Sequence, residues 1–468
     1  MTKENTLIKN TIIVTIGKIC TQLVSFFLLP LYTALLSTEE YGVVDLLNTL
    51  INLIVPVFIM QMDQGVFRFL IENREKEEKK NQLITVTIYF MIVQIVLYTA
   101  FFFLVNPWIH NEYKYFLLSN MIAALLSTVM LQISRGLGDN FSYSIGSFLA
   151  GSITVALNVV LIAGMRLGAY GMLAASFVGN MVCAVYLVVK LKIPQKVRKK
   201  YYSKQILIVL LKYSVPLIPN VISWWIITAS NRIIISFFLN LSANGIYSAA
   251  NKFSGVIVTL YGVFNLTWTE SASVNIDSED RDVFFSKILE QVVLIFGSIC
   301  LLVISFMPFV FPIMINEKFQ EAYPQIPILM IATVFNILIS YFGSIYVAKK
   351  LTKEIAKTSV FAAVINIGLN VLLINHIGLF AASLGTAIAY FSMFLYRCLD
   401  SQKYVKLRIR RSILISMIGM YLWTLFSYYL NYFALNIVTA FITLVYALWI
   451  NRDNAVLILN TVKRKIKK

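Results

Sequence analysis

Three basic side chains lie inside long apolar stretches of the chain: Lys18 and Lys252 are near the middle of theirs, and Arg232 is nearer an end, within reach of the membrane interface. Lys18, Arg232 and Lys252 each fall within a run of residues that is mostly hydrophobic. A lysine or arginine at the middle of a bilayer costs about 2.5–3.5 kcal/mol on insertion scales, so such a residue is a functional candidate by default. Ammonium and guanidinium groups in a sheltered cleft are suited to an anionic ligand such as a phosphate. The sequence therefore predicts a cationic binding site within a membrane.

Polar residues at helical spacing accompany these cations. Steps of three and four residues place side chains on one face of a helix. Four such faces are Thr11, Thr15, Lys18, Gln22 and Ser25; Asp45, Asn48 and Asn52; Asn220, Trp224, Thr228 and Asn231; and Asn244, Ser248, Lys252, Gly255 and Thr259. Hydrogen bonding between helices is the alternative for most of the single residues. A cation on a continuous polar face favours a wet cleft instead.

We expect the substrate to be bound from these faces. The candidate residues are Lys18, Gln22, Asn48, Asn220, Trp224, Arg232, Asn251 and Lys252. Trp224 lies beside Trp225 in mid-segment, and one of these rings would stack on a sugar, with packing against lipid as the alternative.

The acidic residues are weaker candidates. Asp45 and Asp63 lie near opposite ends of one apolar segment, at a depth where a solvated carboxylate is expected, and a coupling-ion role is assigned to them as a hypothesis. The cysteines and histidines lack metal-ligand spacing, and no phosphate-binding glycine loop is present in the sequence. We therefore expect no catalytic residues, no metal and no cofactor, and a protein that is not an enzyme.

The elements that position these residues are membrane-spanning helices. The 468 residues are 59% hydrophobic and 13% charged, with a mean hydropathy of +0.77, whereas soluble domains are about 45–50% apolar and about 25% charged. We predict an all-α membrane protein of about 14 spans. Their approximate ranges are 10–35, 42–68, 82–105, 114–134, 143–164, 168–191, 206–239, 243–268, 285–315, 321–348, 355–376, 378–400, 412–430 and 433–451.

The net charge of +18 sets an orientation rather than indicating nucleic acid. Most of the 40 lysines and arginines lie in or next to the loops and tails on one side of the membrane, whereas Lys114, Arg166 and Lys318 fall on the other side. Because basic residues stay inside, we expect both termini in the cytoplasm.

The segments appear in two related sets of six. EEYGVVDLLN at 39–48 and SANGIYSAAN at 242–251 share the Gly42/Gly245 and Asn48/Asn251 positions. LNVVLI at 157–162 is closer to LNVLLI at 369–374, and each is followed by a glycine, Gly168 and Gly378, before an aromatic and a small residue. An even number of spans per copy gives parallel repeats related by an axis along the membrane normal. The predicted division is an N-terminal lobe at 1–191, a basic cytoplasmic linker at 192–205, a C-terminal lobe at 206–400, and two extra helices with a basic tail at 401–468.

Several short motifs resemble a known family, the polysaccharide-biosynthesis (Wzx-type) flippases of the multidrug/oligosaccharidyl-lipid/polysaccharide exporter superfamily. They are Glu40-Tyr41-Gly42, Phe67-Arg68-Phe69, Pro216-Leu217-Ile218-Pro219-Asn220, Asn231-Arg232 and Gly245-Ile246-Tyr247-Ser248-Ala249-Ala250. The resemblance implies a two-lobed bundle like that of the MATE exporters, in a bacterial cytoplasmic membrane. It also implies transport by alternating access of a polyprenyl-diphosphate-linked oligosaccharide for O-antigen, capsule or a related polymer. The family's cationic cavity corresponds to Lys18, Arg232 and Lys252.

The expected partners follow from this resemblance. They are the lipid-linked oligosaccharide, membrane lipids, a proton or monovalent cation, and polymerase and glycosyltransferases of the same pathway, with no nucleic acid. A cation-coupled multidrug exporter of the same superfamily is the first alternative, and it would favour buried carboxylates. A membrane-embedded polysaccharide polymerase is the second, and it would need a long outer loop, whereas the outer loops here are short.

Overall fold

A computed structural model describes residues 26–452 of the chain. The side chains of Asn220, Ser223, Trp224, Ile227, Thr228 and Thr352 lie outside the description, although their backbone is included. Most of the first predicted segment, 10–35, falls outside the described residues.

Helices make up the described part of the chain, and no strand occurs within residues 26–452. This confirms the predicted all-helical class. Helices suit a bilayer because each satisfies its own backbone hydrogen bonds where no water is present. The helices cluster into two compact units, Met1–Ile233 and Ile234–Lys468. The predicted linker packs within the first unit, where Ile193 belongs to the core and Val197 packs against it, and the division between the units falls inside α11. The lobe boundaries at 1–191 and 206–400 stay a prediction.

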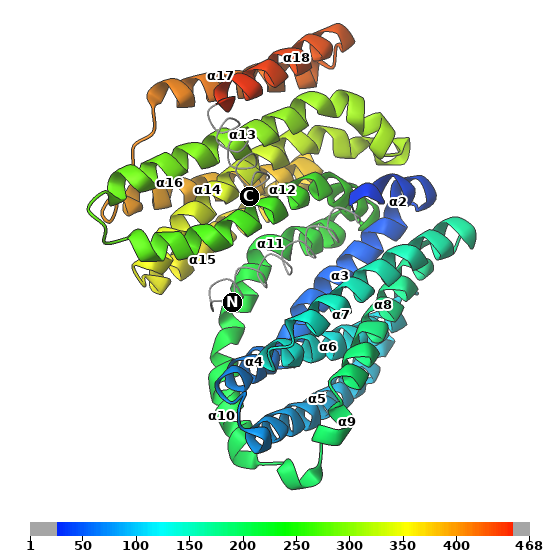
Figure 1. The fold of residues 1–468 in the computed structure, drawn as a ribbon. Helices are drawn as coiled ribbons and strands as arrows, with labels where there is room; N and C mark the ends of the chain where they lie inside the picture. Colours follow the sequence, from blue (N-terminus) through cyan, green and yellow to red (C-terminus); the bar gives the residue numbers. More distant parts are fainter. Residues whose placement is uncertain (1–25, 453–468) are drawn as a thin grey trace, which may run out of the picture. The chain divides into compact units, whose positions relative to one another are not determined.

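The first unit contains nine α-helices and the start of a tenth within its described residues (Figure 1). Their bounds are α2 (Leu29–Leu35), α3 (Thr38–Phe58), α4 (Met62–Glu72), α5 (Glu77–Val105), α6 (Lys114–Gly136), α7 (Asn140–Asn158), α8 (Gly168–Lys190), α9 (Ile193–Lys196), α10 (Lys204–Ser214) and α11 (Ile218–Phe238). Short η helices lie between them: η1 (Asn106–Trp108), η2 (Val159–Gly164), η3 (Lys199–Tyr201) and η4 (Val215–Leu217).

The second unit includes the last residues of α11 and is otherwise built largely from longer helices. They are α12 (Leu241–Asn275), α13 (Arg281–Met314), η5 (Glu317–Gln325), α14 (Ile326–Ala348), α15 (Thr352–Ile377), α16 (Leu379–Ser401), α17 (Arg411–Leu430) and α18 (Phe433–Ile450). Helix α14 packs against both α12 and α16, and α15 lies along α16 (Figure 1). Ile339, Ala362, Ala389 and Met393 form a small core where α14, α15 and α16 meet.

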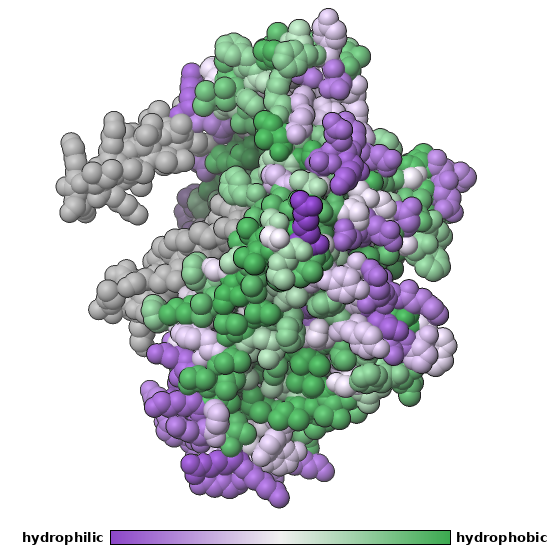
Figure 2. All heavy atoms as spheres, turned by 90° about the vertical axis from the view of Figure 1, so that its right-hand side faces the viewer, coloured by the Kyte–Doolittle hydropathy of each residue, from purple (hydrophilic) through white to green (hydrophobic). Residues whose placement is uncertain are grey.

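Eleven helices of the described residues are long and apolar enough to cross a membrane. Apolar side chains also cover the outside of the molecule: Val96 and Phe101 of α5 and Phe441 of α18 are all more than half exposed. Figure 2 shows hydrophobic residues over much of one face. An apolar surface of this extent belongs in lipid rather than in water. The chain is a multi-pass membrane protein, while the count of 14 spans and the repeat layout stay predictions.

Two predicted spans are broken in the structure. The 42–68 segment ends as α3 after Pro56, passes through Met60 and Gln61 with φ of 52° and 54°, and resumes as α4. The 206–239 segment is broken at η4, which contains Pro216. A proline inside a helix removes a backbone donor and clashes with the preceding turn. A proline lies at or just before each of the two breaks, Pro56 near the end of α3 and Pro216 in η4. Pro30 and Pro219 instead lie in the first turns of α2 and α11, where a proline is tolerated.

Glu40, from the first family motif, joins two helix starts. Its side chain accepts a hydrogen bond from the Ser37 backbone at 2.8 Å, completing a capping box at α3, and another from the Ala169 amide of α8 at 3.2 Å. Gly168 has φ of +54°, and a Cβ there would lie 1.9 Å from Glu40 Oε1. Its predicted repeat partner, Gly378, has φ of +56° before α16. The duplication itself stays a prediction.

Candidate functional site

An ion pair joins α3 to α11 within the first unit. Nε of Arg232 donates to Oδ2 of Asp45 at 2.7 Å, and each side chain is only 17% exposed. The sequence places Arg232 within reach of the interface and Asp45 as a solvated carboxylate. The expectation for Asp45 is wrong because the guanidinium of Arg232, 187 positions away in sequence, replaces water as its partner.

A second bond links the same two helices. The indole nitrogen of Trp225 donates to the backbone oxygen of Thr49 at 3.0 Å. Thr49 lies one turn beyond Asp45 on α3, and Trp225 lies about two turns before Arg232 on α11. The two contacts fix the register of α11 against α3. Trp225 thus has a positioning role, whereas the Trp224 side chain lies outside the described residues.

Two further polar residues lie close to the ion pair along α3 and α11. Asn48 lies three residues after Asp45, on the same face of α3, and is half-buried. Asn231, which precedes Arg232, is only 5% exposed. A guanidinium is a planar fork of donors that binds oxyanions such as carboxylates and phosphates, and in Arg232 its Nε donates to Asp45.

Asp63 is buried rather than solvated. It is 4% exposed at the start of α4, and its Oδ2 accepts a hydrogen bond from Nε2 of Gln64 at 2.7 Å. Within residues 26–452, Oδ1 has no hydrogen-bond partner. The expectation of a solvated carboxylate is wrong here too, because the break after Pro56 turns α4 and its first residues into the packed interior. A buried carboxylate with an unsatisfied oxygen is suited to hold a proton or a cation.

In the second unit, the predicted polar face lies on α12. Asn244 and Ser248 are buried at 0% and 2% exposure. Asn251, Lys252, Gly255 and Thr259 are only partly buried. The exposure of these polar residues therefore rises along α12, so the face does not point wholly into lipid. Lys252 lies beside the more accessible part of the helix.

The structure brings together Asp45, Arg232, Thr49 and Trp225, with Asn48 beside them. Lys18 and Gln22 lie outside the described residues, as do the side chains of Asn220 and Trp224. Lys252 and Asn251 belong to the second unit. A single cleft shared by Lys18, Arg232 and Lys252 stays a prediction.

One buried cation was not singled out from the sequence. Arg397 of α16 is 3% exposed and donates to Oγ1 of Thr358 at 2.8 and 3.0 Å and to the Ile339 backbone oxygen at 3.0 Å. It therefore ties α16 to α15 and α14. Because Arg397 lies near the predicted end of its span, the sequence indicates a residue at the membrane interface. The hydrogen bonds assign it a structural role.

Solved structures of membrane transporters share this fold. The chain is similar to the lipid II flippase MurJ in an inward closed conformation, with a TM-score of 0.69, 15% identity, and coverage of 96% of this chain and 100% of that one. It is also similar to an inward-facing MATE family multidrug transporter, with a TM-score of 0.68, 13% identity, and coverage of 82% and 95%. A third likeness is to a transporter of the same superfamily from Pyrococcus furiosus, with a TM-score of 0.54, 15% identity, and coverage of 84% and 96%. The fold is that of the multidrug/oligosaccharidyl-lipid/polysaccharide superfamily of transporters and flippases.

The sequence also identifies a family, which is a narrower class than the fold. The sequence profile described as "Polysaccharide biosynthesis protein" matches residues 7–269, more than half of the chain. The chain belongs to this family, as the motif resemblance implies. No curated protein matches the chain.

Proposed function

We propose that this protein is a flippase that carries a polyprenyl-diphosphate-linked oligosaccharide across the bacterial cytoplasmic membrane for assembly of a surface polysaccharide, O-antigen, capsule or a related polymer. Transport proceeds by alternating access of the two predicted six-helix lobes. The termini lie in the cytoplasm, and polymerase and glycosyltransferases of the same pathway supply and consume the cargo.

The observation that carries the proposal is the shielded ion pair of Asp45 and Arg232. Its guanidinium lies in a predicted membrane span and pairs with the Asp45 carboxylate. A diphosphate offers more oxygens and more charge than that carboxylate, in a geometry that a guanidinium binds with two parallel hydrogen bonds. The diphosphate of the head group can therefore displace Asp45 as the partner of Arg232. Lys18 and Lys252 add the remaining positive charge in this proposal.

The cargo explains why a polar path is needed. A hydroxyl group that enters alkane without a partner costs about 4–8 kcal/mol, so a head group of several sugars faces a barrier of tens of kcal/mol. Asn48 and the polar face of α12 offer amide and hydroxyl partners for such a head group. The prenyl tail stays in hydrocarbon beside the apolar surface.

Asp63 is the proposed coupling residue. Its buried carboxylate has one oxygen without a partner in the described part of the chain, and it lies next to the break between α3 and α4. Binding a proton or a monovalent cation there would neutralise the charge and ease movement at the break. We assign Asp45 to the ion pair with Arg232 rather than to coupling.

Reconstitution into vesicles tests the proposal. A fluorescent short-chain prenyl-diphosphate disaccharide is placed in both leaflets, and a membrane-impermeant quencher measures how fast the inner pool becomes accessible. Vesicles with the protein should flip this lipid much faster than empty vesicles. A protein that flips it no faster than empty vesicles contradicts the proposal.

A cation-coupled drug exporter is the second candidate, and the buried carboxylate of Asp63 favours it. The same vesicles separate the two candidates. Proton-driven uptake of ethidium, lost in Asp63→Asn and retained in a variant with an exposed carboxylate changed, Glu279→Gln, would support the exporter. The flippase predicts no ethidium transport in any variant.

A further inference from the structure

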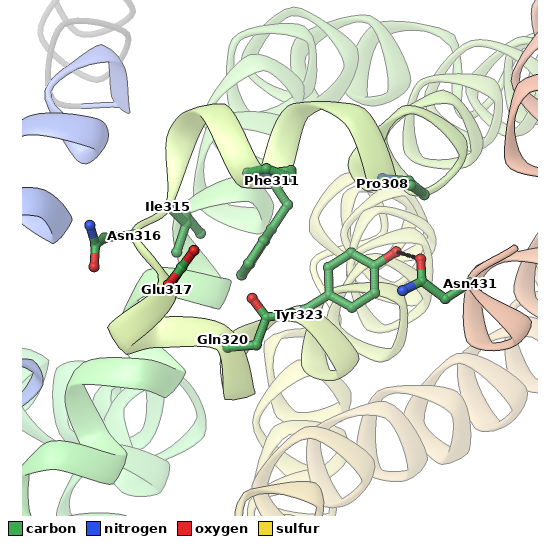
Figure 3. Close-up of a pocket in the computed structure, with 9 residues that line it drawn as sticks. Pro308, Phe311, Ile315, Asn316, Glu317, Gln320, Tyr323 and Asn431 are labelled. Carbon is green, nitrogen blue, oxygen red and sulfur yellow. Dashed lines mark hydrogen bonds between the residues drawn. The ribbon is translucent and has the colours of Figure 1, made fainter. Parts of the chain in front are cut away.

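The second unit has a pocket far along the chain from the predicted substrate residues. It measures about 380 Å³ and lies between the C-terminal end of α13, the helix η5 and the turn that joins α17 to α18 (Figure 3). Its lining residues are Pro308, Phe311, Pro312, Ile315, Asn316, Glu317, Gln320, Tyr323 and Asn431. Pockets that hold small ligands have volumes of about 300–1,000 Å³, so this one has room for a small ligand.

The polar groups of the pocket both donate and accept hydrogen bonds. Asn316, Gln320 and Asn431 have side-chain amides, Tyr323 has a hydroxyl, and Glu317 has a carboxylate. Pro312 has no N–H, so the carbonyl of Pro308, four residues earlier in α13, lacks its usual helix donor.

Apolar surface completes the lining. Phe311 projects from α13 toward Gln320 and Tyr323 (Figure 3), and the rings of Phe311 and Tyr323 meet edge to face at 5.1 Å. Amides and a carboxylate beside aromatic rings match a sugar, whose hydroxyls both donate and accept and whose C–H groups are apolar. No lysine or arginine lines the pocket, which disfavours a phosphate.

The walls of the pocket are held in place by the protein itself. Tyr323 stacks on Tyr428 at a centroid distance of 4.3 Å, and the Tyr428 hydroxyl donates to the Tyr323 backbone oxygen at 2.6 Å. Tyr323 OH and the Asn436 amide both donate to Oδ1 of Asn431, at 3.4 and 3.5 Å. The amide nitrogen of Asn431 is then the group that donates to a ligand. A preformed site loses less entropy when it binds.

We propose that this pocket binds a single neutral sugar unit and that helices α17 and α18, through Asn431, belong to the site. Two connections line the pocket, the one between α13 and α14 and the turn between α17 and α18. In the predicted orientation, both lie on the outer side of the membrane. That the sugar comes from the translocated head group rests on the proposed flippase function. The binding itself follows from the pocket.

Ligand-observed saturation-transfer NMR tests the proposal on the full chain. The protein is purified in lauryldimethylamine oxide, a detergent without sugar. The probes are methyl glycosides of glucose, galactose, mannose, rhamnose, N-acetylglucosamine and N-acetylgalactosamine, with glycerophosphoethanolamine as a lipid head-group probe. We expect at least one glycoside to bind with a millimolar Kd. No glycoside binding, or binding of the lipid head group alone, would overturn the proposal.

Substitutions place the binding in the pocket. Gln320→Ala changes an exposed side chain, and Asn431→Gly suits the left-handed conformation of that residue, φ 49°. The double variant should bind the glycoside at least tenfold more weakly, and Glu317→Gln should also weaken it. Glu321→Gln, on the exposed surface of the same helix η5 but outside the pocket, is the matched control and should bind normally.

Two results separate this inference from the proposed function. Unchanged glycoside binding in Gln320→Ala/Asn431→Gly, with thermal stability like that of the parent protein, overturns the sugar site and leaves the flippase proposal intact. Glycoside binding by a protein that does not flip the lipid in vesicles leaves the pocket standing and removes the flippase.

Discussion

Arg232 and Asp45 lie 187 positions apart in the chain, yet their side chains meet at 2.7 Å with little exposure of either. This bond helps to hold α11 against α3 and places the charge of Arg232 beside that of Asp45. Together with the bond from Trp225 to Thr49, it makes the predicted cationic residue a fixed rather than a freely moving group.

The ion pair predicts a loss of stability when one partner is removed. Asp45→Asn and Arg232→Gln should each destabilise the protein by about 3 kcal/mol, because a shielded charge is left without its partner. Thermal unfolding in detergent, followed by tryptophan fluorescence, measures the effect. The double variant should lose less than the sum of the two single losses, and a strictly additive result would show that the pair is not coupled.

Gly168 and Gly378 predict unequal costs for the same substitution. Both have positive φ, but a Cβ at Gly168 meets Glu40 Oε1 whereas a Cβ at Gly378 meets nothing within 4 Å. Gly378→Ala should cost only the backbone strain, about 1–3 kcal/mol. Gly168→Ala should cost clearly more and lower the melting temperature further. Equal melting temperatures would contradict the contact between Glu40 and the start of α8.

Close packing of α4 against α10 gives a third prediction. A Cβ at Gly65 would lie 2.3 Å from Oγ of Ser214, which is fully buried, whereas a Cβ at Gly262 of α12 meets nothing. Gly65→Ala should therefore destabilise the protein by about 1–3 kcal/mol. Gly262→Ala should be neutral or stabilise it by about 0.5–1 kcal/mol, since alanine favours a helix. A Gly65→Ala variant as stable as Gly262→Ala would argue against this packing.

Arg397 predicts a structural rather than a transport defect. Arg397→Met removes the bonds to Thr358 and the Ile339 carbonyl and should destabilise the protein by about 2–3 kcal/mol. Lys357→Met, an exposed cation on α15, is the control and should have little effect. The flipping rate per folded molecule should stay near that of the parent protein. A normal melting temperature with abolished flipping would instead place Arg397 in the transport path.

Much of the fold can be predicted from the sequence because it depends on local signals. Hydrophobic length identifies the helices, and Pro56 and Pro216 mark two breaks that the structure contains. The depth of Asp63 was not predictable, because it depends on how the chain turns after Pro56. Helical periodicity does place Asp45 and Asn48 on one polar face.

The contacts of the site could not be predicted in the same way. A bond between Asp45 and Arg232 leaves no trace in the spacing of either residue, because it joins two helices far apart in sequence. Glu40 is similar: the Ser37-to-Glu40 spacing suits a capping box, but nothing local indicates its bond to Ala169. Arg397 lies near a segment end, so its burial by α14 and α15 emerges only from packing.

The most direct test of the central claim is the flipping rate of the prenyl-diphosphate disaccharide with Arg232 removed. The account predicts that Arg232→Ala slows flipping at least tenfold, and that Lys18→Ala and Lys252→Ala slow it as well. Arg198→Ala, which changes an exposed arginine, should flip at the parent rate. Full flipping by all three cationic-site variants, present at normal levels in the vesicles, would contradict the account.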